Sequence, residues 1–159
     1  MSKHQPVPES ATSGRLQFDE RLSVPWWWYP PAVGIAVLLG AEVHMGYPGV
    51  RSWIGYAIAV PLLLGALVWL GRTRVQVKGR ELRVGNARLP LRYVGRTEIV
   101  AKQDKQVALG PELDPAAFLL HRAWVGQLVR VELLDPEDPT PYWIFSTRDP
   151  DGLVAALRR

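Results

Sequence analysis

Two long apolar runs separated by a short polar stretch dominate the first half of the chain. They span 24–43 and 53–70, and neither carries the polar stripe that a surface helix of a globular domain needs. Each run is about 20 residues long, the length with which a helix crosses the hydrocarbon core of a bilayer. The pattern predicts a transmembrane helical hairpin over 24–70, with helices at about 26–44 and 53–70.

Aromatic residues gather at the ends of both runs. Trp26–Tyr29 open the first run, Trp69 closes the second, and Trp53 and Tyr56 lie beside the connecting turn. Amphipathic rings favour the membrane–water interface, so this placement suits an antiparallel pair of membrane helices. The alternative is a helical hairpin buried inside protein, which the missing polar stripe disfavours.

Basic residues near the ends of the runs predict the orientation of the hairpin. The connecting turn carries Arg51 alone. The outer flanks carry several more basic residues: Lys3, Arg15, Arg21, Arg72, Arg74, Lys78 and Arg80. By the positive-inside rule, the chain is expected to be a two-helix protein of the cell membrane with both termini in the cytoplasm.

From 73 onward the apolar pattern changes to a period of two. Val75 and Val77 alternate with polar residues, and similar alternation recurs at 81–84 and 127–134, while 142–147 is apolar on both faces, as a well-covered strand is. At the end of the chain, Asp149 and Pro150 suit a helix start, which predicts a helix over 150–158. The fold class is therefore α+β: the hairpin, then a small antiparallel β domain over 71–159 that the C-terminal helix closes. The polar tail over 1–23 is expected to be disordered.

A resemblance supports this architecture. It rests on Glu42–Gly49, Asp114–Phe118, Asp135–Trp143 and Ser146–Arg148, and it covers most of the chain from about Phe18 onward. In these segments the chain resembles an uncharacterised family of actinobacterial two-helix membrane proteins with a pleckstrin-homology-like cytoplasmic domain. The resemblance implies that fold but brings no known activity and no catalytic residue, because fold alone does not fix function.

A strongly basic segment follows the second apolar run. Eight basic residues between 72 and 96 face one acidic residue, Glu81, so eight minus one gives a local charge of +7. Basic residues beside a membrane attract anionic lipid by about 1 kcal/mol each. A solvated strand face that only reflects topology remains the alternative, while nucleic acid is not expected because stacking aromatics are not interleaved with the patch. The residues expected to bind lipid are Arg72, Arg74, Lys78, Arg80, Arg83 and Arg88.

A second candidate site lies at the turn of the hairpin. Glu42, His44 and Arg51 form a polar cluster, and ionisable groups near membrane segments are often functional. Either these residues begin an outer loop that water and headgroups solvate, or they handle ions or a partner at the outer mouth. Two ligands alone do not make a metal site, so no metal is expected.

Catalytic signatures are missing from the sequence. It contains no cysteine, no nucleophile elbow, no phosphate-binding glycine loop and no H-E-x-x-H motif, so neither an enzyme nor a cofactor is expected. The expected function is a membrane-apposed binding or scaffolding module for anionic lipid or a protein partner. The alternatives are an accessory subunit of a larger membrane complex and an oligomeric ion-handling protein that uses Glu42 and His44. The oligomeric state is left open.

Overall fold

The computed structural model describes residues 15–158 of the chain. These residues form two compact units, one from 21 to 73 and the other from 15–20 together with 74–158. We call the first the hairpin unit and the second the β unit.

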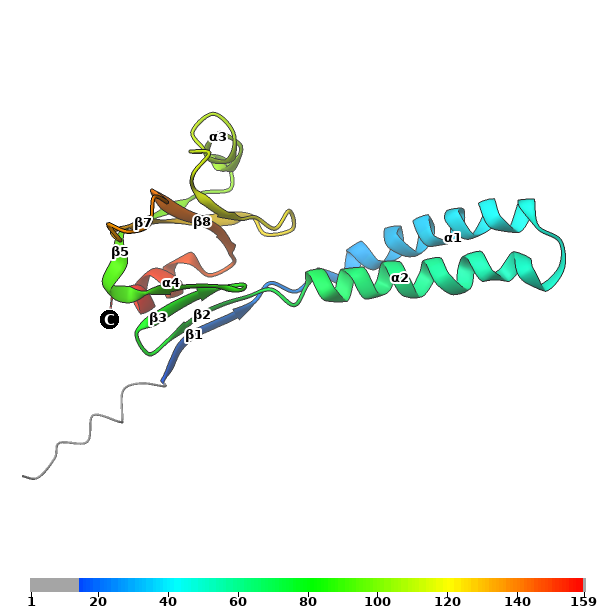
Figure 1. Ribbon diagram of the computed structural model, residues 1–159, viewed down its shortest axis with the longest axis horizontal. Helices are drawn as coiled ribbons and strands as arrows, with labels where there is room; N and C mark the ends of the chain where they lie inside the picture. Colours follow the sequence, from blue (N-terminus) through cyan, green and yellow to red (C-terminus); the bar gives the residue numbers. More distant parts are fainter. Residues whose placement is uncertain (1–14, 159) are drawn as a thin grey trace, which may run out of the picture. The chain divides into compact units, whose positions relative to one another are not determined.

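The hairpin unit consists of two helices that lie side by side (Figure 1). A 3-10 turn, η1 (Trp26–Trp28), leads into α1 (Tyr29–Gly46), and η2 (Gly49–Trp53) leads into α2 (Ile54–Leu70). The helices pack through small residues: Ala36 and Gly40 are buried in α1, and a Cβ built on Gly55 of α2 would lie 2.8 Å from the Cβ of Val43. Close approach of the two backbones therefore requires glycine at positions 40 and 55.

Hydrogen bonds tie together the two ends of the hairpin unit. The backbone N–H of Leu22 donates to the carbonyl of Thr73 at 2.9 Å, and Arg21 Nε donates to the carbonyl of Gly71 at 3.2 Å. The chain therefore enters and leaves this unit at neighbouring points. One helical segment among the described residues, Gly49–Leu70, is long and apolar enough to cross a membrane. The helix α1 does not meet the same criterion of length and apolar composition.

In the β unit, sheet A has four strands in chain order. Two-residue turns join β2 to β3 and β3 to β4, with Gly79 and Gly85 as the first central residues at φ of 61° and 62°. Positive φ at that position is the conformation that glycine adopts without strain. The strands of sheet A are β1 (Leu16–Arg21), β2 (Arg74–Lys78), β3 (Glu81–Val84) and β4 (Ala87–Pro90).

Sheet B has the strand order β5-β7-β8-β6 and follows β4 through the 3-10 turn η3 (Leu91–Tyr93). The pairs β5–β7 and β7–β8 are antiparallel, whereas β6 runs parallel to β8. The wholly antiparallel domain that the sequence predicts is thus wrong at β6, because the chain passes through a short helix, α3 (Lys105–Leu109), and loops before it joins the edge of the sheet. The strands are β5 (Val94–Val100), β6 (Phe118–Leu120), β7 (Gln127–Leu133) and β8 (Tyr142–Thr147).

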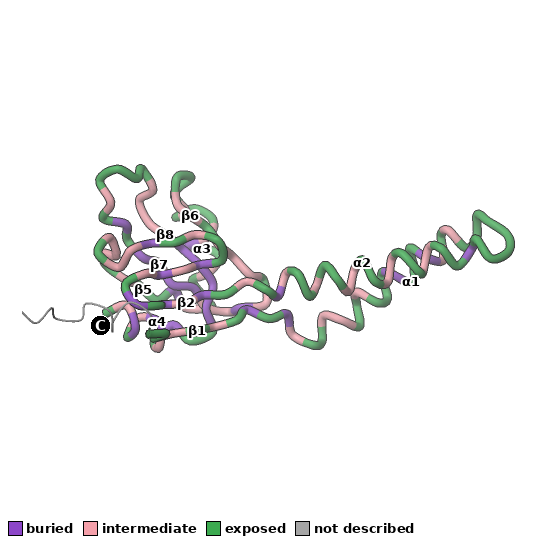
Figure 2. The backbone as a smooth tube through the Cα atoms, turned by 60° about the horizontal axis from the view of Figure 1, so that its bottom comes forward, coloured by how far each residue is buried: buried purple, intermediate pink, exposed green. Residues whose placement is uncertain are grey.

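The core of the β unit is formed by the two sheets and the C-terminal helix. The helix α4 (Pro150–Leu157) contacts β2, β5 and β7, and so packs against both sheets (Figure 1). Leu153 of α4, Leu82 of β3 and Phe145 of β8 are fully buried. Figure 2 shows the buried positions concentrated on these strands, while the helical hairpin is mostly exposed or half-buried. The chain is therefore α+β with two sheets.

A second, smaller cluster lies beneath α3. Ala108 of α3 packs with Val100, Leu128 and Ile144, and Leu109 borders them. This cluster covers Ile144 of β8, a strand that is buried at every position from Trp143 to Thr147, as the apolar run in the sequence suggests.

The tail that the sequence predicts as disordered over 1–23 requires a correction. Its first part, 1–14, lies outside the described residues, but from Leu16 the chain forms β1 at the edge of sheet A. Glu20 stabilises this strand, since its carboxylate accepts from Thr147 Oγ1 at 2.5 Å and from the backbone N–H of Arg148 at 2.8 Å. Pairing with residues far along the chain thus makes this segment a strand, although its local composition is polar.

Candidate functional site

The strands of sheet A carry basic side chains on one face and apolar side chains on the other. In β2 and β3, Val75, Val77, Leu82 and Val84 are fully buried, and the residues between them are exposed or half-buried. Because side chains alternate along a strand, Arg74 and Lys78 of β2 and Arg83 of β3 share the other face. We call this surface the outer face of sheet A.

Two arginines lie directly opposite each other on the outer face. Arg83 of β3 and Arg88 of β4 are partners in the antiparallel register, and Gln76 is the partner of Arg83 on β2. Like charges at opposed positions destabilise a sheet by a few tenths of a kcal/mol to about 1 kcal/mol relative to alanine. The row therefore concentrates positive charge at a cost to stability.

Acidic residues compensate this charge only in part. Arg83 Nε contacts Glu81 Oε2 at 2.6 Å, and Arg74 Nη1 lies 3.9 Å from Asp19 Oδ2. Within 15–158, Arg88 forms no ion pair. Asp19 also accepts a hydrogen bond of 2.9 Å from Gln76 Nε2, which fixes that amide between the arginines.

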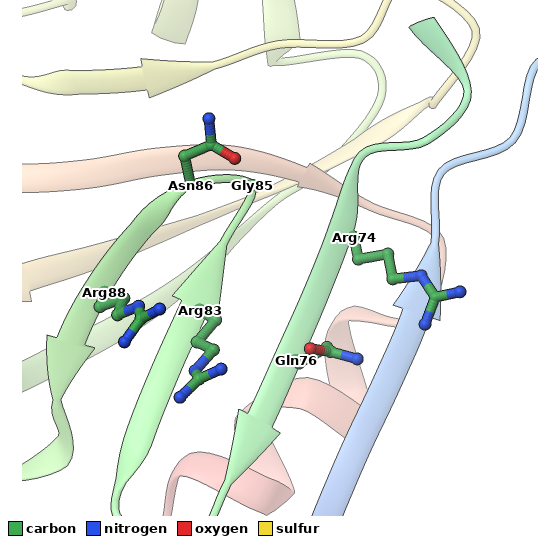
Figure 3. A pocket seen from close by; sticks show the side chains of 6 residues that line it. All are labelled: Arg74, Gln76, Arg83, Gly85, Asn86 and Arg88. Carbon is green, nitrogen blue, oxygen red and sulfur yellow. The ribbon is translucent and has the colours of Figure 1, made fainter. Parts of the chain in front are cut away.

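Figure 3 shows a shallow pocket on the outer face, near the turn between β3 and β4. Its volume is about 310 Å³. Arg83 and Arg88 extend next to each other on one side of it, and Arg74 lies toward β1. Guanidinium and amide N–H groups around such a depression suit an anion with several oxygen acceptors. We call it the basic pocket, and it is lined by Arg74, Gln76, Arg83, Gly85, Asn86 and Arg88.

Of the six residues predicted to bind lipid, the structure brings Arg74, Arg83 and Arg88 together in the basic pocket. Lys78 pairs in register with Glu81 at the other end of the strands, and Arg72 belongs to the hairpin unit. Arg80 lines a different cavity of about 560 Å³. That cavity also contains Arg92, Arg158, Gln17, Gly79, Pro90, Leu91 and Leu157.

The sequence pattern did not identify Gln76, Asn86 or Asp19 as part of the site. Gln76 shares its face with Arg74 by strand alternation, and Asn86 occupies the second position of the Gly85 turn, so both could have been inferred from the pattern. Asp19 could not have been inferred, because the sequence around it does not show that this segment pairs with sheet A.

At the turn of the hairpin unit, Glu42, His44 and Arg51 are all exposed. The ring of His44 lies edge-on to Trp53, with centroids 5.8 Å apart, and 6.0 Å from that of Tyr56. Among residues 15–158 no ion pair joins the three polar residues, so the structure places them at one end of the hairpin without linking their charged groups.

Metal-ligating side chains do not converge in the described part of the chain. No group of three His, Asp or Glu residues there has the spacing to hold a metal ion. The acidic loop between β7 and β8 is instead organised by its own backbone: Asp135 accepts from the N–H of Glu137 at 3.1 Å, and Asp138 accepts from that of Thr140 at 2.9 Å. Hydrogen bonds from the side chain of Thr140, and then from its backbone N–H, lower the pKa of Asp138.

The fold and the outer face can now be compared with known proteins. A family model described as "Protein of unknown function (DUF3093)" matches residues 17–157, nearly all of the described chain. The chain belongs to this family. No curated protein and no solved structure matches it.

Proposed function

We propose that the chain is an integral protein of the cell membrane, anchored by the hairpin unit as two membrane helices with both termini in the cytoplasm. Exposed apolar side chains on both helices support this proposal. Leu38 and Leu39 of α1 are 68% and 52% exposed, and Ile58 and Leu62 of α2 are 59% and 63% exposed. Such surfaces are costly in water, at roughly 25 cal/mol per Å², and a bilayer removes the cost.

The proposed role of the β unit is to bind anionic lipid headgroups through the outer face of sheet A. The single observation that carries this role is the basic pocket, where three arginines gather and Arg83 and Arg88 oppose each other. Four residues after Leu70, Arg74 can lie at most about 14 Å along the chain from the end of α2. The Debye length at physiological salt is about 8 Å, so this upper limit is less than two Debye lengths and Arg74 stays where an anionic membrane surface still attracts it.

The finer fold that we propose for the β unit is pleckstrin-homology-like. Two sheets with a C-terminal helix packed against both are consistent with that architecture. The parallel pairing of β6 with β8 is a departure that the chain accommodates at the sheet edge.

The experiment that tests lipid binding uses the full chain in mixed micelles that contain phosphatidylcholine and phosphatidylglycerol. Native mass spectrometry counts the lipids that each protein retains. The double variant Arg83→Gln with Arg88→Gln should retain much less phosphatidylglycerol and the same phosphatidylcholine, because it loses the opposed guanidinium groups of the basic pocket.

A matched control removes two positive charges away from sheet A, one from α3 and one from the segment between β5 and α3. Lys102→Gln with Lys105→Gln changes the net charge equally but leaves the outer face of sheet A intact, so its retained phosphatidylglycerol should equal that of the parent. Equal loss in both double variants would mean that net charge alone attracts the lipid. Unchanged retention in the Arg83/Arg88 variant would refute the proposed site.

A further inference from the structure

A cavity of about 580 Å³ lies on the β unit beside α3. It is formed by α3, by the segment between β5 and α3, and by the segment between β6 and β7. Its volume is within the range of roughly 300–1,000 Å³ that small-molecule sites occupy. We call it the α3 pocket, and it is lined by Lys102, Gln103, Lys105, Gln106, Leu109, Gly110, His121, Ala123 and Gly126.

All ionisable residues that line the α3 pocket are basic. They are Lys102, Lys105 and His121, and no aspartate or glutamate is among the lining residues. Lys105 Nζ donates to the backbone carbonyl of Val125, which holds this side chain at the wall. His121 Nε2 is shielded from solvent and has no hydrogen-bond partner. The pocket thus collects positive charge and hydrogen-bonding groups without a counter-charge.

Burial and neighbouring positive charges lower the pKa values of two of these side chains. Burial, and then the charge of Lys102, lower the pKa of Lys105. Burial, and then the charges of Lys105 and Arg122, lower the pKa of His121. An anion that binds in the cavity would stabilise the protonated forms of these two side chains.

Part of the lining of the α3 pocket is apolar and well supported. Leu109 packs against the cluster of Val100, Ala108, Leu128 and Ile144 beneath α3, so its position is fixed by the fold. Ala123 and Gly126 leave room beside it. A ligand for this pocket needs an anionic group at one end and a short apolar body at the other.

We infer that the α3 pocket binds a small organic anion, with its phosphate or carboxylate group between Lys102, Lys105 and His121 and its apolar part against Leu109. This site shares no residue with the basic pocket, so it does not depend on the proposed lipid binding. Its ligand is a small molecule from the aqueous phase, not a lipid within the bilayer.

The test follows the titration of His121 by NMR in the full chain, labelled at histidine and held in phosphatidylcholine nanodiscs. The probe is hexyl phosphate, which has one phosphate group and one short apolar chain. Binding should raise the pKa of His121, because a nearby anion favours the protonated imidazole. The other two histidines of the chain, His4 and His44, are internal references whose resonances should not respond to the probe.

Three further arms test which groups bind the probe. The variant Lys102→Gln should raise the dissociation constant of hexyl phosphate by about tenfold, and Lys105→Gln should do the same if its loss of the bond to Val125 leaves the fold intact. Lys78→Gln, on the other sheet, is the matched control and should bind as the parent does. Inorganic phosphate should bind more weakly than hexyl phosphate, since it lacks the apolar part.

Several results would overturn the inference. One is a His121 titration that stays unchanged at saturating hexyl phosphate. Another is an equal response in the parent and in a folded Lys102→Gln variant. A third is a response that appears only in nanodiscs containing phosphatidic acid, since this would assign the α3 pocket to a lipid headgroup.

Discussion

Replacing Gly55 by alanine tests the packing of the hairpin unit. The added Cβ would lie 2.8 Å from the Cβ of Val43 and 3.1 Å from the Cα and carbonyl oxygen of Gly40. Two of these three contacts are with backbone atoms, which cannot move aside as a flexible side chain can. The helices α1 and α2 must therefore separate, and the contact around buried Ala36 and Gly40 loosens.

Two opposing terms determine the expected size of this effect. Alanine gains about 0.5–1 kcal/mol over glycine inside a helix. Overpacking a tight contact costs about 1–3 kcal/mol. The free energy of unfolding of Gly55→Ala should therefore fall by about 1 kcal/mol. Gly34 and Gly65 provide matched controls, because a Cβ built on either meets nothing within 4 Å. Alanine there should leave the hairpin as stable as before or slightly more stable.

Unfolding of the full chain by sodium dodecyl sulfate in mixed micelles, followed by circular dichroism, measures these differences. The order of stability should be Gly65→Ala first, then the parent, then Gly55→Ala. Equal stability of Gly55→Ala and Gly65→Ala would show that α1 and α2 do not pack closely at Gly55.

Three other predictions concern the β unit. Asp149→Ala should lower the free energy of unfolding by about 1 kcal/mol, since Asp149 Oδ1 accepts from the N–H of Gly152 at 2.9 Å to cap α4, whereas Asp149→Asn should largely preserve it. Arg88→Thr should raise the free energy of unfolding by about 0.2–1 kcal/mol, because it removes the repulsion between Arg88 and Arg83. The same variant should retain less phosphatidylglycerol. A loss of stability would contradict the opposed-charge argument. Since the folded-state pKa of His121 is lowered, the unfolded chain binds its proton first, and stability should fall as pH drops below about 6.5. A His121→Gln variant should show a smaller change in unfolding free energy between about pH 7.5 and 5, and an identical pH profile would exclude this origin.

Much of the fold was predictable because the local pattern and the final structure agree. The glycines at 79 and 85 mark two-residue turns. The strands on either side of Gly79 follow the alternation of Val75 and Val77 in β2 and of Leu82 in β3. The C-terminal helix begins at Pro150 after its capping residue, as that sequence predicts. The parts that escaped prediction, β1 and the parallel pairing of β6 with β8, depend on contacts with distant segments, which a local pattern does not contain.

The candidate site was predictable as a charged surface but not as a set of contacts. Strand alternation places Arg74, Arg83 and Arg88 on one face, as the sequence suggests. Arg80 lies in the turn after Gly79 and lines another cavity. The ion pair of Asp19 with Arg74 depends on the strand β1, which the sequence did not predict. The α3 pocket was not foreseen, because α3 and His121 are far apart along the chain.

The central claim is that the outer face of sheet A lies against anionic lipid while the hairpin unit spans the membrane. Since the chain has no cysteine, Asn86→Cys introduces a single thiol beside the basic pocket, where a fluorophore can report contact with lipid headgroups. Quenching by nitroxide-labelled headgroups should be strong in nanodiscs that contain phosphatidylglycerol, weak in phosphatidylcholine alone, and should decrease as salt screens the attraction. Equal quenching in both nanodiscs at every salt concentration would contradict the account.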